Sequence, residues 1–175
     1  MDRVLIRLVG LLGALLTPEA ARADALVGTK TVTVISDPMG NLLPRSLPGA
    51  VMDYRLNVSN PLGNLLKPVK SVVIVENIPD NCDLQVTDLA SAGRGPVEFL
   101  DGNLLGTGLL GSGLTFTYNP AAVDSVEFYS EGAWTSTTSA TSGSYNPSIR
   151  AVRITLAGTF ATSTAFQLRY RVRIR

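Results

Sequence analysis

Histidine is absent from this 175-residue sequence, and cysteine occurs only once, as Cys82. The commonest general base and metal ligand is therefore missing, and zinc sites built from several Cys and His ligands are excluded. A single cysteine also excludes a disulfide within the chain. Cys82 either packs as a small apolar side chain or pairs with another chain, and the nearby Asp80 and Asp83 disfavour a reactive thiolate.

Lysine is also scarce and is limited to Lys30, Lys67 and Lys70. Lys70 and Ser71 are adjacent on an expected strand, so their side chains should point to opposite faces and not form a Ser-Lys dyad. Hydrolysis of a glycoside requires a pair of carboxylates. No spacing in the sequence pairs the acidic residues that could serve, which are Glu76, Asp88, Glu98, Glu127 and Glu131. The sequence therefore predicts no catalytic residues and a protein that is not an enzyme.

Two short motifs bear a limited likeness to ligand sites. Residues 106–111 match G-x-G-x-x-G, but they lead into a Thr-rich strand and not into a helix, so no dinucleotide site is expected. Asp80, Asn81 and Asp83 carry oxygens that could bind Ca²⁺, without the spacing and distal Glu of an EF-hand loop. A turn with a capping aspartate is the favoured interpretation, and a surface Ca²⁺ site is the alternative. We expect no cofactor and no metal ligands.

No apolar run reaches the roughly 20 residues that a membrane span requires. The longest such run, residues 8–16, lies between a short basic N-terminal region and the small residues of Ala21-Arg22-Ala23. This order of features predicts a secretory signal peptide over residues 1–23. The mature chain, residues 24–175, is then periplasmic or extracellular and has no transmembrane segment.

The charge of the mature chain is balanced. The 15 basic and 14 acidic residues of the full sequence fall to equal numbers once the three arginines and two acids of residues 1–23 are removed. A neutral chain has no general attraction for polyanions. Nucleic acid is therefore not an expected partner.

Strand signals recur between turns that contain proline and glycine. Residues 52–58 and 166–174 alternate apolar and polar side chains, which indicates half-buried strands, whereas residues 72–75 form a continuous apolar run that predicts a central strand. Other expected strands cover residues 31–35, 84–87, 97–100, 114–118, 126–128 and 152–156. The pattern predicts an all-β protein, an Ig-like antiparallel β-sandwich of eight to nine strands, as a single domain over residues 24–175.

Aromatic side chains gather near a Thr/Ser/Gly-rich stretch, residues 131–147. Trp134, Tyr129 and Tyr145 could form an exposed platform of the kind on which β-sandwiches hold sugars. The favoured alternative is that Trp134 fills one end of the sandwich, because large aromatic side chains are mostly buried.

The last expected strand carries Arg169, Arg171, Arg173 and Arg175 at alternate positions, so they share one face of the sheet. Such a ladder could bind an anionic polysaccharide. It could also be solvated, paired with acids on neighbouring strands, or placed to guard a sheet edge against aggregation. We favour these structural roles over ligand binding.

The tetrad Gly-Asn-Leu-Leu occurs three times, beginning at Gly40, Gly63 and Gly102, without the constant spacing of a repeat. Gly-Asn suits a turn, and we expect the leucine pair to fold back onto the core. If the pairs are exposed, they become candidate contact sites. Leu104 and Leu105 of the third tetrad are the leading candidates.

Three segments together resemble the bacterial conserved-repeat surface domain, also called domain of unknown function eleven. They are residues 30–38 (KTVTVISDP), 48–60 (PGAVMDYRLNVSN) and 72–79 (VVIVENIP). In that family a Pro-Gly turn leads into a strand ending in Ser/Thr-Asn, and a Val-rich strand ends in Ile/Leu-Pro. The resemblance implies an Ig-like sandwich of cell-surface or extracellular proteins without assigned catalytic residues. This chain has one copy where tandem arrays are common.

The expected function is therefore that of an exported structural or interaction module of the cell envelope or exterior. Other envelope proteins or a surface polysaccharide are the expected partners. The alternative is a carbohydrate-binding module that uses Trp134 and the arginine ladder.

Overall fold

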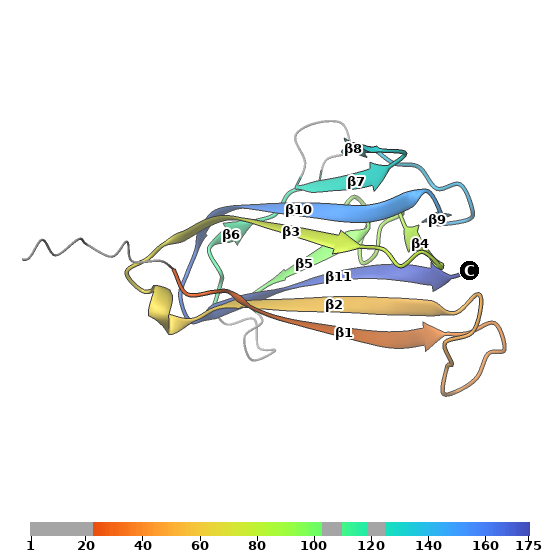
Figure 1. Cartoon of the computed structure of the whole chain (residues 1–175). Coiled ribbons are helices and arrows are strands. Elements are labelled where there is room, and N and C mark those ends of the chain that lie inside the picture. The colour runs from red at the N-terminus through yellow and green to blue at the C-terminus, as the bar shows by residue number, and fades with distance from the viewer. Residues whose placement is uncertain (1–22, 103–109, 119–124) are drawn as a thin grey trace, which may run out of the picture.

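The computed structural model describes residues 23–102, 110–118 and 125–175, and these residues form two antiparallel β-sheets packed as a sandwich (Figure 1). The six-stranded sheet contains β1 (Val27–Ser36), β2 (Val51–Asn60), β4 (Cys82–Gln85), β5 (Val97–Asp101), β9 (Tyr145–Asn146) and β11 (Thr164–Ile174). The five-stranded sheet contains β3 (Val69–Asn77), β6 (Leu114–Thr115), β7 (Val126–Ser130), β8 (Ala133–Thr135) and β10 (Ile149–Phe160). A short 3-10 helix, η1 (Leu62–Asn64), follows β2.

The all-β sandwich predicted from the sequence is confirmed. The sequence predicted eight to nine strands, and the described residues contain eleven. The additional strands are β8 and β9, which are three and two residues long, and the strand expected at residues 114–118 is reduced to the two residues of β6. Strands this short carry too few residues to show an alternating pattern.

Each sheet is organised around one long central strand. β11 pairs with β2 along one side and with β4 and β5 along the other, while β10 pairs with β3 on one side and with β6 and β7 on the other. The central position predicted for residues 72–75 is wrong, because β3 is an edge strand whose Val73 and Val75 are exposed. Valines on both faces of a strand suggest burial on both faces, but here only the inward Val72 and Ile74 pack toward the core.

The core lies between the two sheets and is built from the alternating apolar positions of the long strands. Fully buried side chains include Phe128, Phe160, Phe166, Ile154, Leu156 and Leu168. Phe160 and Phe166 pack with ring centroids 5.3 Å apart. Burying each such side chain contributes about 1.5–3 kcal/mol, so this layer is the main source of stability in a chain that cannot form a disulfide.

A polar link joins the sheets at the side where β1 and β3 form their edges. The buried Tyr170 on β11 donates a hydrogen bond from its hydroxyl to Glu76 on β3 at 2.9 Å. Lys30 on β1 pairs with the same carboxylate and lies over the ring of Tyr54, 4.9 Å from its centroid. This cluster therefore satisfies the single charge of β1 within the chain.

Candidate interaction surfaces

The arginine ladder lies on the face of the six-stranded sheet that is turned away from the core. Arg169 Nη2 lies 2.8 Å from Asp53 Oδ2, and its Nη1 lies 2.9 Å from Glu98 Oε2. Arg171 Nε lies 2.6 Å from the other oxygen of Asp53. Asp53 is only 2% exposed, so the two guanidinium groups cover its carboxylate almost completely.

The second half of the ladder uses another acid. Arg173 Nη2 lies 3.0 Å from Asp83 Oδ2, and Arg175 Nε lies 3.0 Å from Asp83 Oδ1. The ladder is thus paired with acids on neighbouring strands, one of the structural roles weighed from the sequence. Because β11 is a central strand, the ladder does not guard a sheet edge.

The electrostatics of Asp53 reflect this pairing. Burial on its own would raise the pKa of the carboxyl group, but hydrogen bonds from Arg171 and Arg169 outweigh burial and hold the pKa below its usual value. The carboxylate is therefore ionised at neutral pH and neutralises part of the positive charge. Little of that charge is left to attract a polyanion.

The three aromatic candidates do not form one platform. Tyr129 on β7 and Trp134 on β8 are neighbours in the five-stranded sheet, with ring centroids 5.2 Å apart. Tyr145 belongs to β9 of the other sheet, where the Arg173 guanidinium lies 4.4 Å from its ring centroid. Burial raises the pKa of the Tyr145 hydroxyl. The aromatics therefore belong to two separate surfaces.

Trp134 lies on the outer face of its sheet, because Val126 and Phe128 occupy the core face of the neighbouring strand. It therefore does not fill the end of the sandwich. The Arg153 guanidinium lies over the indole, 4.4 Å from the ring centroid, and Arg153 Nε lies 2.6 Å from Glu127 Oε2. A sugar ring that stacked on this face would have to displace Arg153.

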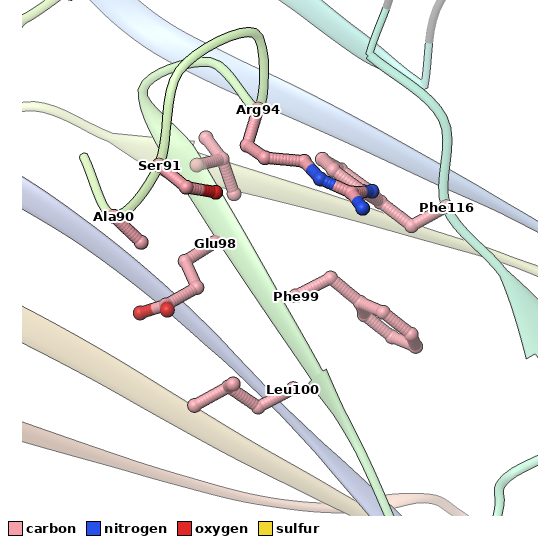
Figure 2. Close-up of a pocket in the computed structure, with 8 residues that line it drawn as sticks. Ala90, Ser91, Arg94, Glu98, Phe99, Leu100 and Phe116 are labelled. Carbon is pink, nitrogen blue, oxygen red and sulfur yellow. The ribbon is translucent and has the colours of Figure 1, made fainter. Parts of the chain in front are cut away.

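A pocket of about 310 Å³ lies where β5 meets the loop that precedes it (Figure 2). Phe99 and Phe116 line it with stacked rings whose centroids are 5.8 Å apart, and Arg94 reaches in from the loop. Glu98 also lines the pocket, but its carboxylate is already paired with Arg169. The pocket can accept a small apolar group, and its one acid is held by a cation.

Acidic side chains elsewhere follow the same pattern. Glu76 is paired with Lys30 and hydrogen-bonded by Tyr170, and Glu127 is paired with Arg153, whose hydrogen bond lowers the pKa of Glu127. These acids therefore link neighbouring strands.

Asp37 organises the turn that follows β1. Its carboxylate accepts hydrogen bonds from the Asn41 side chain at 2.8 Å and from the backbone N–H groups of Met39 and Arg45, each at 2.9 Å. The side chain of Asn41, followed by the backbone of Arg45, lowers the pKa of Asp37 to about 2. The turn that carries the first Gly-Asn-Leu-Leu tetrad is therefore anchored at several points.

Asn64 organises the second tetrad. Its amide nitrogen donates to Asn60 Oδ1 at 2.7 Å and to the backbone oxygen of Asp24 at 3.0 Å. The Asp24 backbone N–H donates in return to Asn64 Oδ1 at 2.6 Å. Because Asn64 is 1% exposed, these bonds satisfy a buried amide and tie η1 to the chain that enters β1.

Both anchored turns present their leucines to solvent. Leu42 and Leu43 are 99% and 85% exposed, and Leu66 is 91% exposed, with Leu65 also exposed. The expectation that the leucine pairs fold onto the core is therefore wrong for these two tetrads, because in each the asparagine takes part in the anchoring network and the leucines do not. The two turns lie at opposite ends of the long strands (Figure 1).

The third tetrad begins at Gly102, where the described range 23–102 ends. Leu104 and Leu105 lie outside the described residues, as does most of the glycine motif at residues 106–111. Leu110, which follows that segment, is exposed. Sequence reasoning singled out the leucines but missed Asp37, whose only local signal was an Asn four residues later.

The remaining candidates have structural roles. Cys82 is buried on β4, and burial raises the pKa of its thiol. Asp83 of the considered Ca²⁺ site is paired with Arg173 and Arg175. The described part of the chain contains no group of three or more His, Cys, Asp or Glu side chains placed to hold a metal ion. Among the same residues, no helix is long and apolar enough to cross a membrane.

No family model, no curated protein and no solved structure matches the chain. What the structure establishes is an all-β sandwich of two antiparallel sheets.

Proposed function

We propose that this chain is an exported, non-catalytic interaction module of the cell envelope or exterior, which contacts partner proteins through its leucine-bearing turns. The observation that carries the proposal is the exposure of Leu42, Leu43, Leu65 and Leu66 on anchored turns. Large contiguous apolar patches are uncommon on monomeric soluble proteins and mark contact sites, and each turn exposes two adjacent leucines. Burying each leucine against a partner would contribute about 1.5–3 kcal/mol.

The anchoring matters as much as the exposure. A mobile loop loses conformational freedom when it binds, which costs about 1–2 kcal/mol for each backbone residue that becomes fixed. The Asp37 and Asn64 networks fix the two turns before any partner arrives. The leucines are thus presented as preorganised contacts.

Two features of the sequence support the export part of the proposal. Residues 1–23 have the order of a signal peptide, and residues 30–79 resemble the conserved-repeat surface domain of exported bacterial proteins. The absence of histidine and the pairing of Glu76, Glu98 and Glu127 with cations support a non-catalytic role. The carbohydrate alternative is weaker, since Arg153 lies over the Trp134 ring.

Affinity purification from envelope extracts tests the proposal. Tagged protein is compared with Leu42→Ser/Leu43→Ser and Leu65→Ser/Leu66→Ser, and with the control Val73→Ser/Val75→Ser, which removes two exposed valines away from the turns. We expect the wild type and the control to retain the same discrete protein and at least one leucine variant to lose it. Equal retention by all four proteins, or no retained protein, would overturn the proposal.

A further inference from the structure

The edges of the two sheets are unequal. Within the described residues β8 and β9 end their sheets with only two or three residues, and β3 is interrupted near Ser71, where φ is 52° and the ladder with β10 shifts. β1 is ten residues long and pairs with β2 without interruption from Val27 to Val34. It is therefore the longest regular edge among the described strands.

β1 also lacks the devices by which proteins protect an edge. It contains no proline, and its bulge lies only at its end, between Val34 and Ser36. Its single charged residue, Lys30, is paired with Glu76 of β3, which neutralises part of the charge that an incoming strand would meet. Unprotected edges of this kind pair with another strand through their backbone N–H and C=O groups.

We infer that β1 is a self-association site, at which the β1 strand of a second copy pairs antiparallel and joins the two six-stranded sheets. An antiparallel pair has the symmetry of a two-fold dimer, so both copies use the same surface. The inference goes beyond the proposed function, because it concerns the strand edge and not the leucine turns.

Charge disfavours a register centred on Lys30. Pairing centred on Lys30 would set two ammonium groups directly opposite each other, whereas pairing centred on Val32 separates them by four residues along the strands, roughly 13 Å. In that register Val32, which is 52% exposed, meets its own copy. On the other face Thr31 lies opposite Thr33 of the partner copy, and threonine pairs of this kind stabilise antiparallel strands.

Charge-swapped variants test the pairing. Thr31→Lys/Thr33→Lys and Thr31→Glu/Thr33→Glu each place like charges across the contact, and both positions are exposed in the monomer. By sedimentation at about 100 µM, since strand contacts are small and associate weakly, we expect the wild type to be dimeric and each variant alone to be monomeric. An equimolar mixture of the two variants should restore the dimer. The control Val73→Glu/Val75→Glu, on the edge strand β3, should remain dimeric.

Cysteine cross-linking tests the same contact without added charge. Val32→Cys should form a disulfide-linked dimer on mild oxidation, because directly opposite residues in antiparallel strands have Cα atoms about 4.5–5.5 Å apart. Val27→Cys is the matched control, since Val27 is 53% exposed on the same strand but lies far from its copy in this register. The native Cys82 is buried and does not interfere.

Three outcomes would overturn the inference. The first is a monomeric wild type at this concentration. The second is a dimer that survives both charged variants or is lost in the β3 control. The third is equal cross-linking of Val27→Cys and Val32→Cys.

Discussion

Tyr170 Oη lies 2.9 Å from Glu76 Oε2, and this hydrogen bond ties the central strand of one sheet to an edge strand of the other. The tyrosine is 1% exposed and the side chain of Glu76 is 13% exposed, so the bond is largely shielded from water. Hydrogen bonds to charged groups are worth more than those between neutral groups. The bond therefore connects the two sheets on the side of the sandwich where β1 and β3 are the edge strands.

Replacing Tyr170 with phenylalanine tests the strength of this link. We expect Tyr170→Phe to lower the free energy of unfolding by about 2 kcal/mol, measured by urea denaturation. Tyr54→Phe is the matched control, because Tyr54 stacks on Tyr170 at 5.2 Å and the described residues offer its hydroxyl no hydrogen bond. It should change stability by less than about 0.5 kcal/mol. Equal losses in the two variants would contradict the role given to the hydroxyl.

Asp53→Asn tests whether the arginine ladder is a structural network. The substitution leaves Arg169 and Arg171 without their shared buried anion, and we expect a loss of about 3 kcal/mol in urea denaturation. Glu127→Gln breaks a more exposed pair with Arg153 and should cost less than about 1 kcal/mol. A cost for Asp53→Asn no greater than that for Glu127→Gln would show that the buried pairing contributes little.

The stability of the turn after β1 should depend on pH through the ionisation of Asp37. The pKa of Asp37 is about 2 in the folded protein and about 3.9 in an unfolded chain, so the ionised form is favoured by folding. Its stabilising contribution is complete above about pH 4 and is lost as the pH falls toward 2. Amide hydrogen exchange of Met39 and Arg45, followed from pH 5 to about pH 2, should therefore accelerate beyond its intrinsic pH dependence.

The matched variant for this measurement is Asp37→Asn, which removes the titrating group. Exchange at Met39 and Arg45 should then be fast throughout and follow only the intrinsic pH dependence. A wild-type profile that coincides with that of Asp37→Asn would contradict the anchoring role.

Trp134→Ala separates a packing role from sugar binding. The indole packs against Tyr129 and Arg153, so its removal should lower the free energy of unfolding by about 2 kcal/mol. A glycan array should give no binding that depends on Trp134. Binding by the wild type that disappears in Trp134→Ala, with the fold retained by circular dichroism, would revive the carbohydrate-binding alternative.

The strands that sequence predicted best are those whose apolar side chains lie mainly on one face. Residues 52–58 and 166–174 alternate because Val58 and Phe166 point into the core while their neighbours do not. For residues 72–75 the predicted central position was wrong. A continuous apolar run looks the same in the sequence whether its valines are buried in a central strand or exposed on an edge strand. Whether a strand lies at the edge or in the centre of its sheet is decided by its pairing with segments that are distant in the sequence.

The site was less predictable for the same reason. The partners of the arginine ladder, Asp53, Glu98 and Asp83, come from three strands that only the fold brings together. The turn that exposes Leu65 and Leu66 is held by Asn64 and Asp24, which are forty residues apart in the sequence. Local sequence identifies the leucines but not the contacts that turn them outward.

Cross-linking in the producing cells tests the proposed interaction role most directly. A photoreactive amino acid is placed at Leu42 or Leu66 on the two turns, and at Val73 as a control that is exposed but lies away from both turns. We predict a discrete adduct with another protein from at least one turn and no such adduct from position 73. If neither turn gave an adduct, or if position 73 gave the same one, the leucine turns would not be the contact surface.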